Sequence, residues 1–166
     1  IDLSASEGCT TCEVGRDASS GWGRLDVATA IGQLAGPLPQ RDWYEANDDA
    51  GRRSYPLSGA TRRLTATVDF WDDQDDVYAV RLKRDQPVYV GLTGADTTVD
   101  FSLAFWLPRT RSIEGVRDVR FRARVSARPG ARQYLSFRAR KTGTYYVQVK
   151  LGSRGAGKYR LVLVKK

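Results

Sequence analysis

The stretch Val99-Asp-Phe-Ser-Leu-Ala-Phe-Trp-Leu107 decides the fold, because large apolar side chains recur in it at every second position. In an extended strand, successive side chains point to opposite faces. Phe101, Leu103 and Phe105 therefore share one face with Leu107, and we expect this face to be buried. The stretch predicts a strand with one side against a hydrophobic core.

The same period of two recurs from residue 62 to the end, in short runs separated by Gly, Pro, Asp and Thr. No helical pattern follows residue 62, which disfavours a parallel sheet because parallel strands need crossover connections. The sequence therefore predicts an all-β fold, an antiparallel β-sandwich or jelly roll of about eight strands. The expected strands span 62–68, 77–83, 87–92, 99–107, 119–125, 133–140, 144–150 and 158–164.

Alternation within three further strands selects the rest of the expected core. We expect these side chains to be buried: Phe121, Ala123, Val125, Tyr145, Val147, Val149, Tyr159, Leu161 and Leu163.

The N-terminal part has a different pattern, with a helical period over about 24–34 in which Leu25, Ala28 and Ile31 lie along one side. Gly36-Pro-Leu-Pro39 then ends the helix. We divide the chain into a tail with a short helical segment (1–36), a linker with a loop leading into the sandwich (37–60) and the sandwich (61–166). The chain starts at Ile1 and has no Met, so we expect it to be a processed or excised piece.

Two cysteines, Cys9 and Cys12, lie in the spacing Cys-Thr-Thr-Cys. This spacing serves a local disulfide, half of a zinc site or a redox pair. The second pair of ligands for zinc is missing, and the surrounding Ser, Gly and Asp do not suit a redox motif. We therefore expect a local disulfide, which implies an oxidising compartment.

Nine of the nineteen acidic residues fall in two short clusters, at 42–49 and 69–76. Carboxylates held close together repel one another unless a cation or water relieves the repulsion. The clusters therefore indicate either a hard-metal site or solvated turns. Calcium is the natural ion because it accepts six to eight oxygen ligands in flexible geometry.

Several short motifs resemble known families. The segment from Gly21 to Ile31 is similar to the closing helix of subtilisin-like serine protease domains. The rest resembles the bacterial pre-peptidase C-terminal domain, through Glu45-Ala-Asn47-Asp48, Asp76-Val-Tyr78, Gly143-Thr-Tyr-Tyr-Val-Gln-Val149 and Lys158-Tyr-Arg-Leu161.

This resemblance implies a non-catalytic accessory domain of a secreted serine protease that aids stability, secretion or attachment to substrate. Its partners would be the catalytic domain of the same parent chain and a protein or cell-surface substrate. Calcium-binding relatives imply a Ca²⁺ site here at Glu45, Asn47, Asp48, Asp73 and Asp76. The chain itself lacks the subtilisin-type triad, because it contains no histidine.

Charge is distributed unevenly, since residues 109–166 carry 17 basic and 2 acidic side chains, a net charge of +15. Alternation places two groups of arginines on the exposed sides of two strands, so we expect rows of positive charge on one arginine-rich sheet face. They suggest an alternative function, binding of an anionic surface or polymer, while the absence of a nucleic-acid-binding motif disfavours DNA and RNA. The arginines are Arg120, Arg122, Arg124, Arg138 and Arg140.

Three tryptophans next to polar loops, Trp43, Trp71 and Trp106, are candidates for contact with a protein substrate. The alternative is that they plug the edges of the sandwich. No apolar run approaches the roughly 18 residues that a membrane-spanning helix needs.

Overall fold

The structure is a computed structural model that describes residues 41–115, 117–153 and 155–166. In that part of the chain it contains nine strands and two short 3-10 helices, η1 (Gly51–Arg53) and η2 (Val119–Phe121). The strands are β1 (Tyr55–Leu57), β2 (Thr61–Asp69), β3 (Asp75–Leu82), β4 (Pro87–Gly94), β5 (Phe101–Trp106), β6 (Arg122–Ser126), β7 (Arg132–Arg138), β8 (Gly143–Leu151) and β9 (Ala156–Lys165).

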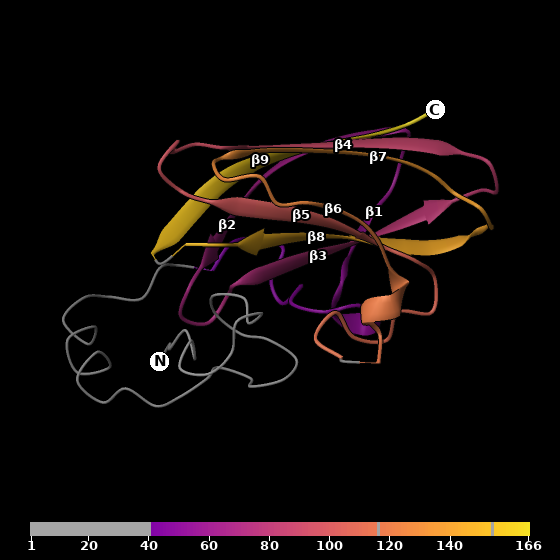
Figure 1. Cartoon of the computed structure of the whole chain (residues 1–166), viewed down its shortest axis with the longest axis horizontal. Helices are drawn as coiled ribbons and strands as arrows, with labels where there is room; N and C mark the ends of the chain where they lie inside the picture. The colour runs from indigo at the N-terminus through magenta and orange to yellow at the C-terminus, as the bar shows by residue number, and fades with distance from the viewer. Residues whose placement is uncertain (1–40, 116, 154) are drawn as a thin grey trace.

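The strands form two sheets that stack as two layers (Figure 1). One sheet has the order β1-β3-β8-β5-β6 and the other has the order β2-β9-β4-β7. All pairings are antiparallel except that of β1 with β3. The predicted all-β sandwich is therefore confirmed.

Each of the eight expected strands has a counterpart, with two differences. Strand β1 lies inside the stretch expected to be linker and loop, and pairs in parallel with β3, with Tyr55 opposite Tyr78. The start of the expected strand 119–125 is instead the 3-10 helix η2, so β6 begins at Arg122.

The main core lies between the two sheets and includes Phe101, Leu103 and Phe105, as expected. Tyr145, Val147, Val149, Tyr159, Leu161 and Leu163 are also buried there. The expectation for Val125 is wrong, because its side chain is 49% exposed. Val125 pairs with Ala104 on β5, so it lies on the face of the edge strand β6 that points away from the core. Leu107, Phe121 and Ala123 are only half-buried.

A second, smaller cluster covers the outer face of the five-stranded sheet. It buries Val77, Trp106 and Tyr146 from the strands under Ala50 and Ile113 from two loops. The Asp49 side chain joins these loops, since its Oδ1 accepts hydrogen bonds from the backbone N–H groups of Ala50 and Ile113, both at 2.7 Å. Strand β5 is therefore buried on both faces.

The expected helix 24–34 and the expected Cys9–Cys12 disulfide lie outside the described residues, and so does the boundary at residue 36. Within the described ranges, no helix is long and apolar enough to cross a membrane.

Candidate functional site

The leading segment, residues 41–50, is fixed against strands of both sheets by hydrogen bonds that it accepts from backbone N–H groups of those strands. The Asn47 carbonyl accepts a hydrogen bond from the N–H of Val77 on β3 at 2.6 Å. The Asp42 Oδ2 accepts one from the N–H of Thr67 on β2 at 2.7 Å. These contacts hold the first acidic cluster of the sequence beside the start of β3.

The second acidic cluster spans the end of β2, the loop that follows and the start of β3, and Asp69 shapes this loop. The Asp69 Oδ1 accepts hydrogen bonds from the N–H groups of Trp71 at 2.7 Å and Asp72 at 3.1 Å. The Asp69 N–H donates to the Asp73 carbonyl at 2.8 Å. Aspartate favours such turns because its side chain bonds nearby backbone N–H groups. The turn places Asp73 beside the leading segment.

Three carboxyl groups meet where these segments touch, which we call the acidic centre: Glu45, Asp73 and Asp76. One oxygen from each lies within 4.8 Å of the other two. Asp73 and Asp76 are buried, and Glu45 is half-buried. The three residues come from the leading segment, the β2–β3 loop and β3, so tertiary folding creates the centre.

Asp76 is held by polar groups on both sides. Its Oδ1 accepts a hydrogen bond from the Asn47 side-chain amide, and its Oδ2 accepts one from the Tyr159 hydroxyl. The Tyr159 hydroxyl is in turn 2.6 Å from that of Tyr78. Asp76 and Tyr78 are two residues apart on β3 and therefore point into the same interior. The network anchors the acidic centre to β9.

The acidic centre contains buried oxygens without hydrogen-bond partners. Across the described ranges, four buried side-chain atoms lack a partner, and three of them are Glu45 Oε1, Asn47 Oδ1 and Asp73 Oδ1. Leaving a buried polar atom unsatisfied costs about 1–3 kcal/mol. Two of these acceptors belong to the acidic centre and the third to the Asn47 amide that is bonded to Asp76, which indicates that a donor or a cation belongs among them.

The shifts in pKa of the three carboxyls agree with a shortage of positive charge. Burial, followed by the charge of Asp76 and that of Glu45, raises the pKa of Asp73 to about 10. Burial likewise raises the pKa of Asp76 well above its ordinary value, and Tyr159 and Asn47 oppose that increase. The pKa of Glu45 is also raised, chiefly by burial. Without a cation, burial therefore favours the protonated forms of these carboxyls.

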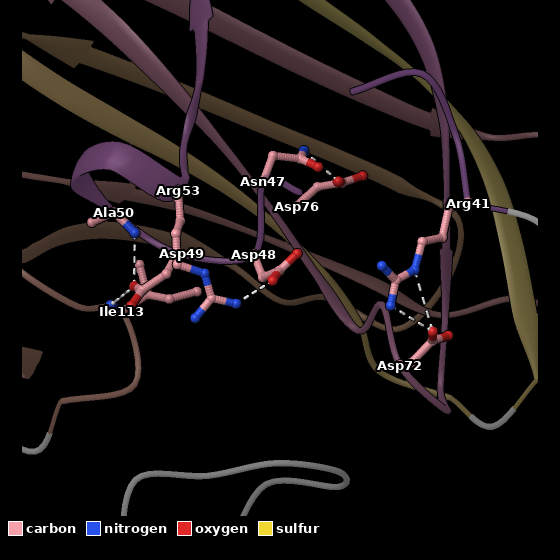
Figure 2. A network of polar contacts seen from close by, with 9 residues as sticks. All are labelled: Arg41, Asn47, Asp48, Asp49, Ala50, Arg53, Asp72, Asp76 and Ile113. Atoms are coloured by element: carbon pink, nitrogen blue, oxygen red, sulfur yellow. Dashed lines mark hydrogen bonds and ion pairs between the residues drawn. The ribbon is translucent and has the colours of Figure 1, made fainter. Parts of the chain in front are cut away.

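Asp48, the remaining expected ligand, has a different environment. Figure 2 shows Asn47 and Asp76 turned toward one another, whereas Asp48 is directed toward Arg53, with which it forms an ion pair. The structure thus brings Glu45, Asn47, Asp73 and Asp76 together and places Asp48 at the border. Asp48 still raises the pKa of Glu45, so it lies close enough to influence the centre.

The donor set fits a hard divalent cation. Carboxylate and amide oxygens are the ligands that calcium prefers. Nitrogen and sulfur ligands, which zinc, copper and nickel favour, do not occur among these side chains. A bound calcium would replace the protons and give the unpartnered oxygens a positive charge to contact.

The five arginines expected to form rows on a sheet are instead spread over both sheets and two connecting segments. All five arginines are exposed. They do not share one sheet face, because Arg122 and Arg124 are on β6 in one sheet and Arg138 is on β7 in the other. Arg120 belongs to η2, and Arg140 follows β7. Arg124, Arg138 and Arg140 line one hollow between β6 and β7.

The three tryptophans differ in exposure. Trp43 is 90% exposed, which leaves it free to contact a partner. Trp71 is half-buried against the main core. Trp106 is 1% exposed and its Nε1 donates to Gln148 Oε1 at 2.8 Å, so the expected surface role of Trp106 is wrong.

Tyr159 and Tyr78 are the site residues that sequence reasoning missed. Tyr159 is buried in the core, as expected, but its hydroxyl also supports Asp76. The spacing Asp76-x-Tyr78 carries a signal for this, since it places a carboxylate on the core face of a strand.

No family model matches the chain, and no curated protein is significantly similar to it. Solved structures do resemble it. The pre-peptidase C-terminal domain of collagenase from Bacillus anthracis is 18% identical, with a TM-score of 0.51, and the match covers 66% of this chain and 93% of that domain.

Another similar structure is PliG of Aeromonas hydrophila, a periplasmic inhibitor of g-type lysozyme. It is 14% identical, with a TM-score of 0.53, and the match covers 68% of this chain and 96% of PliG. At these identities the likeness shows a shared fold. The chain therefore has the sandwich fold of a pre-peptidase C-terminal domain, a fold that a lysozyme inhibitor also uses.

Proposed function

We propose that this chain is a non-catalytic accessory domain of a secreted protease and that calcium at the acidic centre stabilises it. One observation carries the calcium part: Glu45, Asn47 and Asp73 each have a buried oxygen without a hydrogen-bond partner, and Glu45 and Asp73 form a close group of carboxyls with Asp76.

Calcium suits this centre better than magnesium does. Magnesium demands near-ideal octahedral geometry and keeps several waters, whereas calcium tolerates irregular sets of six to eight oxygens. The acidic centre is buried and irregular, with ligands from three separate segments. Calcium would hold the leading segment, the β2–β3 loop and β3 together, so binding would stabilise the folded form by mass action.

The accessory role is supported by three observations. The sequence resembles the pre-peptidase C-terminal domain, and a collagenase domain of that kind has the same fold. The chain contains no histidine, so it cannot form a subtilisin-type triad. We extend this proposal to a subtilisin-like parent and to an extracellular location, and the sequence encoded upstream tests it. A Gly-Thr-Ser-x-Ala/Pro motif is expected there, and an unrelated domain would contradict the protease parent.

Thermal unfolding of the whole chain tests the calcium proposal. Calcium at 100 times its dissociation constant should add about 2.7 kcal/mol to the free energy of unfolding. For a chain of this size, that corresponds to a rise in Tm of about 5–10 °C over the value in chelator. Magnesium at the same concentration should give a much smaller rise.

Asp72 offers a matched control because it is the immediate neighbour of Asp73 but is exposed and paired with Arg41 at 2.9 Å. Asp73→Asn should abolish the calcium response, and Asp72→Asn should keep it. Equal Tm values in calcium and in chelator would refute the calcium proposal.

A further inference from the structure

A second charged region lies where β6 and β7 run near one another, and we call residues 119–140 the arginine edge. This segment contains seven arginines and no aspartate or glutamate. All seven arginine side chains are exposed. Such a one-sign cluster creates a strong local positive potential. The arginines are Arg120, Arg122, Arg124, Arg128, Arg132, Arg138 and Arg140.

Two hollows lie along this edge, and both are lined by β6 and β7. One, of about 430 Å³, lies between Arg124 on β6 and Phe137 and Arg138 on β7. The other, of about 600 Å³, is lined by Val125 and by Arg132 and Tyr134. The edge is therefore hollowed at both ends of β7.

A buried hydrogen-bond network joins the two strands near the second hollow. The Ser126 hydroxyl donates to Gln133 Oε1 at 2.7 Å, and the Gln133 side-chain amide donates to the Arg128 carbonyl at 2.6 Å. Gln133 is buried, so these bonds fix the spacing of the strands. The second hollow consequently has a defined shape before any partner arrives.

Both strands lie at the edges of their sheets. Within the described part of the chain, β6 pairs only with β5, and β7 pairs only with β4. An edge strand presents a row of unpaired backbone N–H and C=O groups that can pair with an added strand. Recognition of extended peptides by strand addition uses such edges.

Exposed apolar side chains also gather here. Four large hydrophobic residues are exposed in the described ranges, and Val119, Val125 and Tyr134 are three of them. A purely charged polymer would contact only the arginines. A polypeptide that alternates acidic and apolar side chains could use the arginines, the apolar residues and the open backbone together.

Two arginines that line the hollows, Arg124 and Arg132, are available for such a partner. The ion pairs described in the ranges 41–115, 117–153 and 155–166 join Arg41 to Asp72, Arg53 to Asp48 and Arg84 to Asp85. None of these pairs uses Arg124 or Arg132. Asp85 lines the first hollow, but its side chain pairs with Arg84.

From these observations we infer that the arginine edge binds an extended acidic segment of another polypeptide, which adds to the edge as a strand. Its carboxylates, on one face of the added strand, contact the arginines, and its apolar side chains, on the opposite face, contact Val125. Strand β7 spans seven residues, a length of roughly 20 Å at about 3.3 Å per residue, so about six residues of the partner would fit. This inference is independent of calcium.

Fluorescence anisotropy with the whole chain tests it, using a labelled synthetic octapeptide that alternates Asp or Glu with Val or Tyr. Saturable binding is expected, and it should weaken several-fold between about 50 and 500 mM salt. Arg124→Glu combined with Arg132→Glu should weaken binding about tenfold or more, because each removes one charge contact and adds a repulsive one. A peptide with Lys in place of the acids should not bind.

The matched control is Arg62→Glu combined with Arg63→Glu, which makes the same charge change on exposed positions of β2, at the edge of the four-stranded sheet opposite β7. This variant should change the dissociation constant less than about twofold. Unchanged Tm values for both double variants would show that folding is intact. Equal weakening by both pairs would overturn the inference, because binding would then follow net charge alone.

Backbone pairing is tested with two versions of the octapeptide, N-methylated at odd or at even residues, which keep their charges but lose donors on one side. At least one version should bind about tenfold more weakly. Binding of both versions as tightly as the unmodified octapeptide, or tighter binding of heparin or single-stranded DNA than of the octapeptide, would overturn the inference in favour of a general polyanion site.

Discussion

The acidic centre and the arginine edge both gather charges of one sign, but they differ in burial. Asp73 and Asp76 are buried and their pKa values are raised. The arginines of the edge are exposed. Removing a charge from water is costly unless a partner compensates, whereas an exposed charge is solvated at little cost. The acidic centre therefore requires protons or a cation, while the arginine edge is stable without a partner.

The two regions also do not neutralise each other through the ion pairs described. Asp72 and Asp48 pair with Arg41 and Arg53, which belong to the same half of the sequence. Among the ion pairs described, none joins these acidic segments to Arg124 or Arg132. The positive charge of these two arginines is thus directed to solvent and to partners.

The largest change in the free energy of unfolding is expected for Trp106, which lies beneath the arginine edge. Trp106 is fully buried, and the Arg122 guanidinium lies 5.9 Å from the centre of its ring. Trp106→Ala should lower the free energy of unfolding by about 3–5 kcal/mol, measured by urea denaturation. Trp43→Ala, on the exposed tryptophan, should change it by less than about 0.5 kcal/mol. Similar losses in both variants would contradict the difference in burial.

The next largest change in the free energy of unfolding is expected for Asp73→Asn. The asparagine amide resembles the protonated carboxyl in shape and carries no charge. In chelator, Asp73→Asn should be as stable as the unsubstituted chain or more stable, by the order of 1 kcal/mol, because no proton uptake is needed. In calcium it should lack the increment of about 2.7 kcal/mol. Paired melting curves check both effects, and a variant that still responds fully to calcium would exclude Asp73 as a ligand.

The stability in chelator and the extra stability that calcium adds should depend on pH in opposite directions. Asp73, Asp76 and Glu45 have pKa values raised above their ordinary range. A group raised in this way contributes fully below pH of about 4, and its contribution is lost as the pH rises toward the folded-state pKa. In chelator, stability should therefore fall as the pH rises from about 4 toward about 10, the range set by Asp73, by up to about 1.4 kcal/mol per pH unit for that group, and Asp76 and Glu45 should act in the same direction.

Calcium competes with those protons, so the increment that it adds should grow over the same range of pH. Urea denaturation at each pH, with and without calcium, measures the increment. Asp73→Asn provides the control, because it should flatten the dependence in chelator. An increment that is equal at pH 5 and pH 8 would contradict the competition.

The smallest change in the free energy of unfolding is expected for substitutions at the arginine edge itself. Arg124→Glu combined with Arg132→Glu should change the free energy of unfolding by less than about 0.5 kcal/mol per substitution, since exposed charges contribute little to stability. Thermal unfolding in about 150 mM salt checks this. A large loss would mean that the arginines support the fold, and the contrast between the two regions would then fail.

Much of the fold could be predicted because alternation is a local property of the sequence. Phe101, Leu103 and Phe105 indicate their strand without any tertiary information. Strand β1 could not be found in this way, because it is three residues long and depends on its pairing with β3. Val125 follows the same alternation as core residues, but it belongs to an edge strand and its side chain stays exposed.

The site is predictable in part. The clustering of acids and the family resemblance are sufficient to indicate Glu45, Asn47, Asp73 and Asp76 as neighbours. They do not reveal that Asp48 pairs with Arg53, since that contact depends on the turn at η1. Nor do they reveal that two loops bury Trp106, because the packing of these loops over the outer face of the sheet is a tertiary property.

Direct calcium titration by isothermal calorimetry tests the central claim, that buried carboxyls from separate segments form a cation site. The whole chain should bind a single calcium ion at the acidic centre, and Asp73→Asn combined with Asp76→Asn should abolish binding while Asp72→Asn preserves it. Absence of binding to the unsubstituted chain, or unchanged binding by the double variant, would contradict the account.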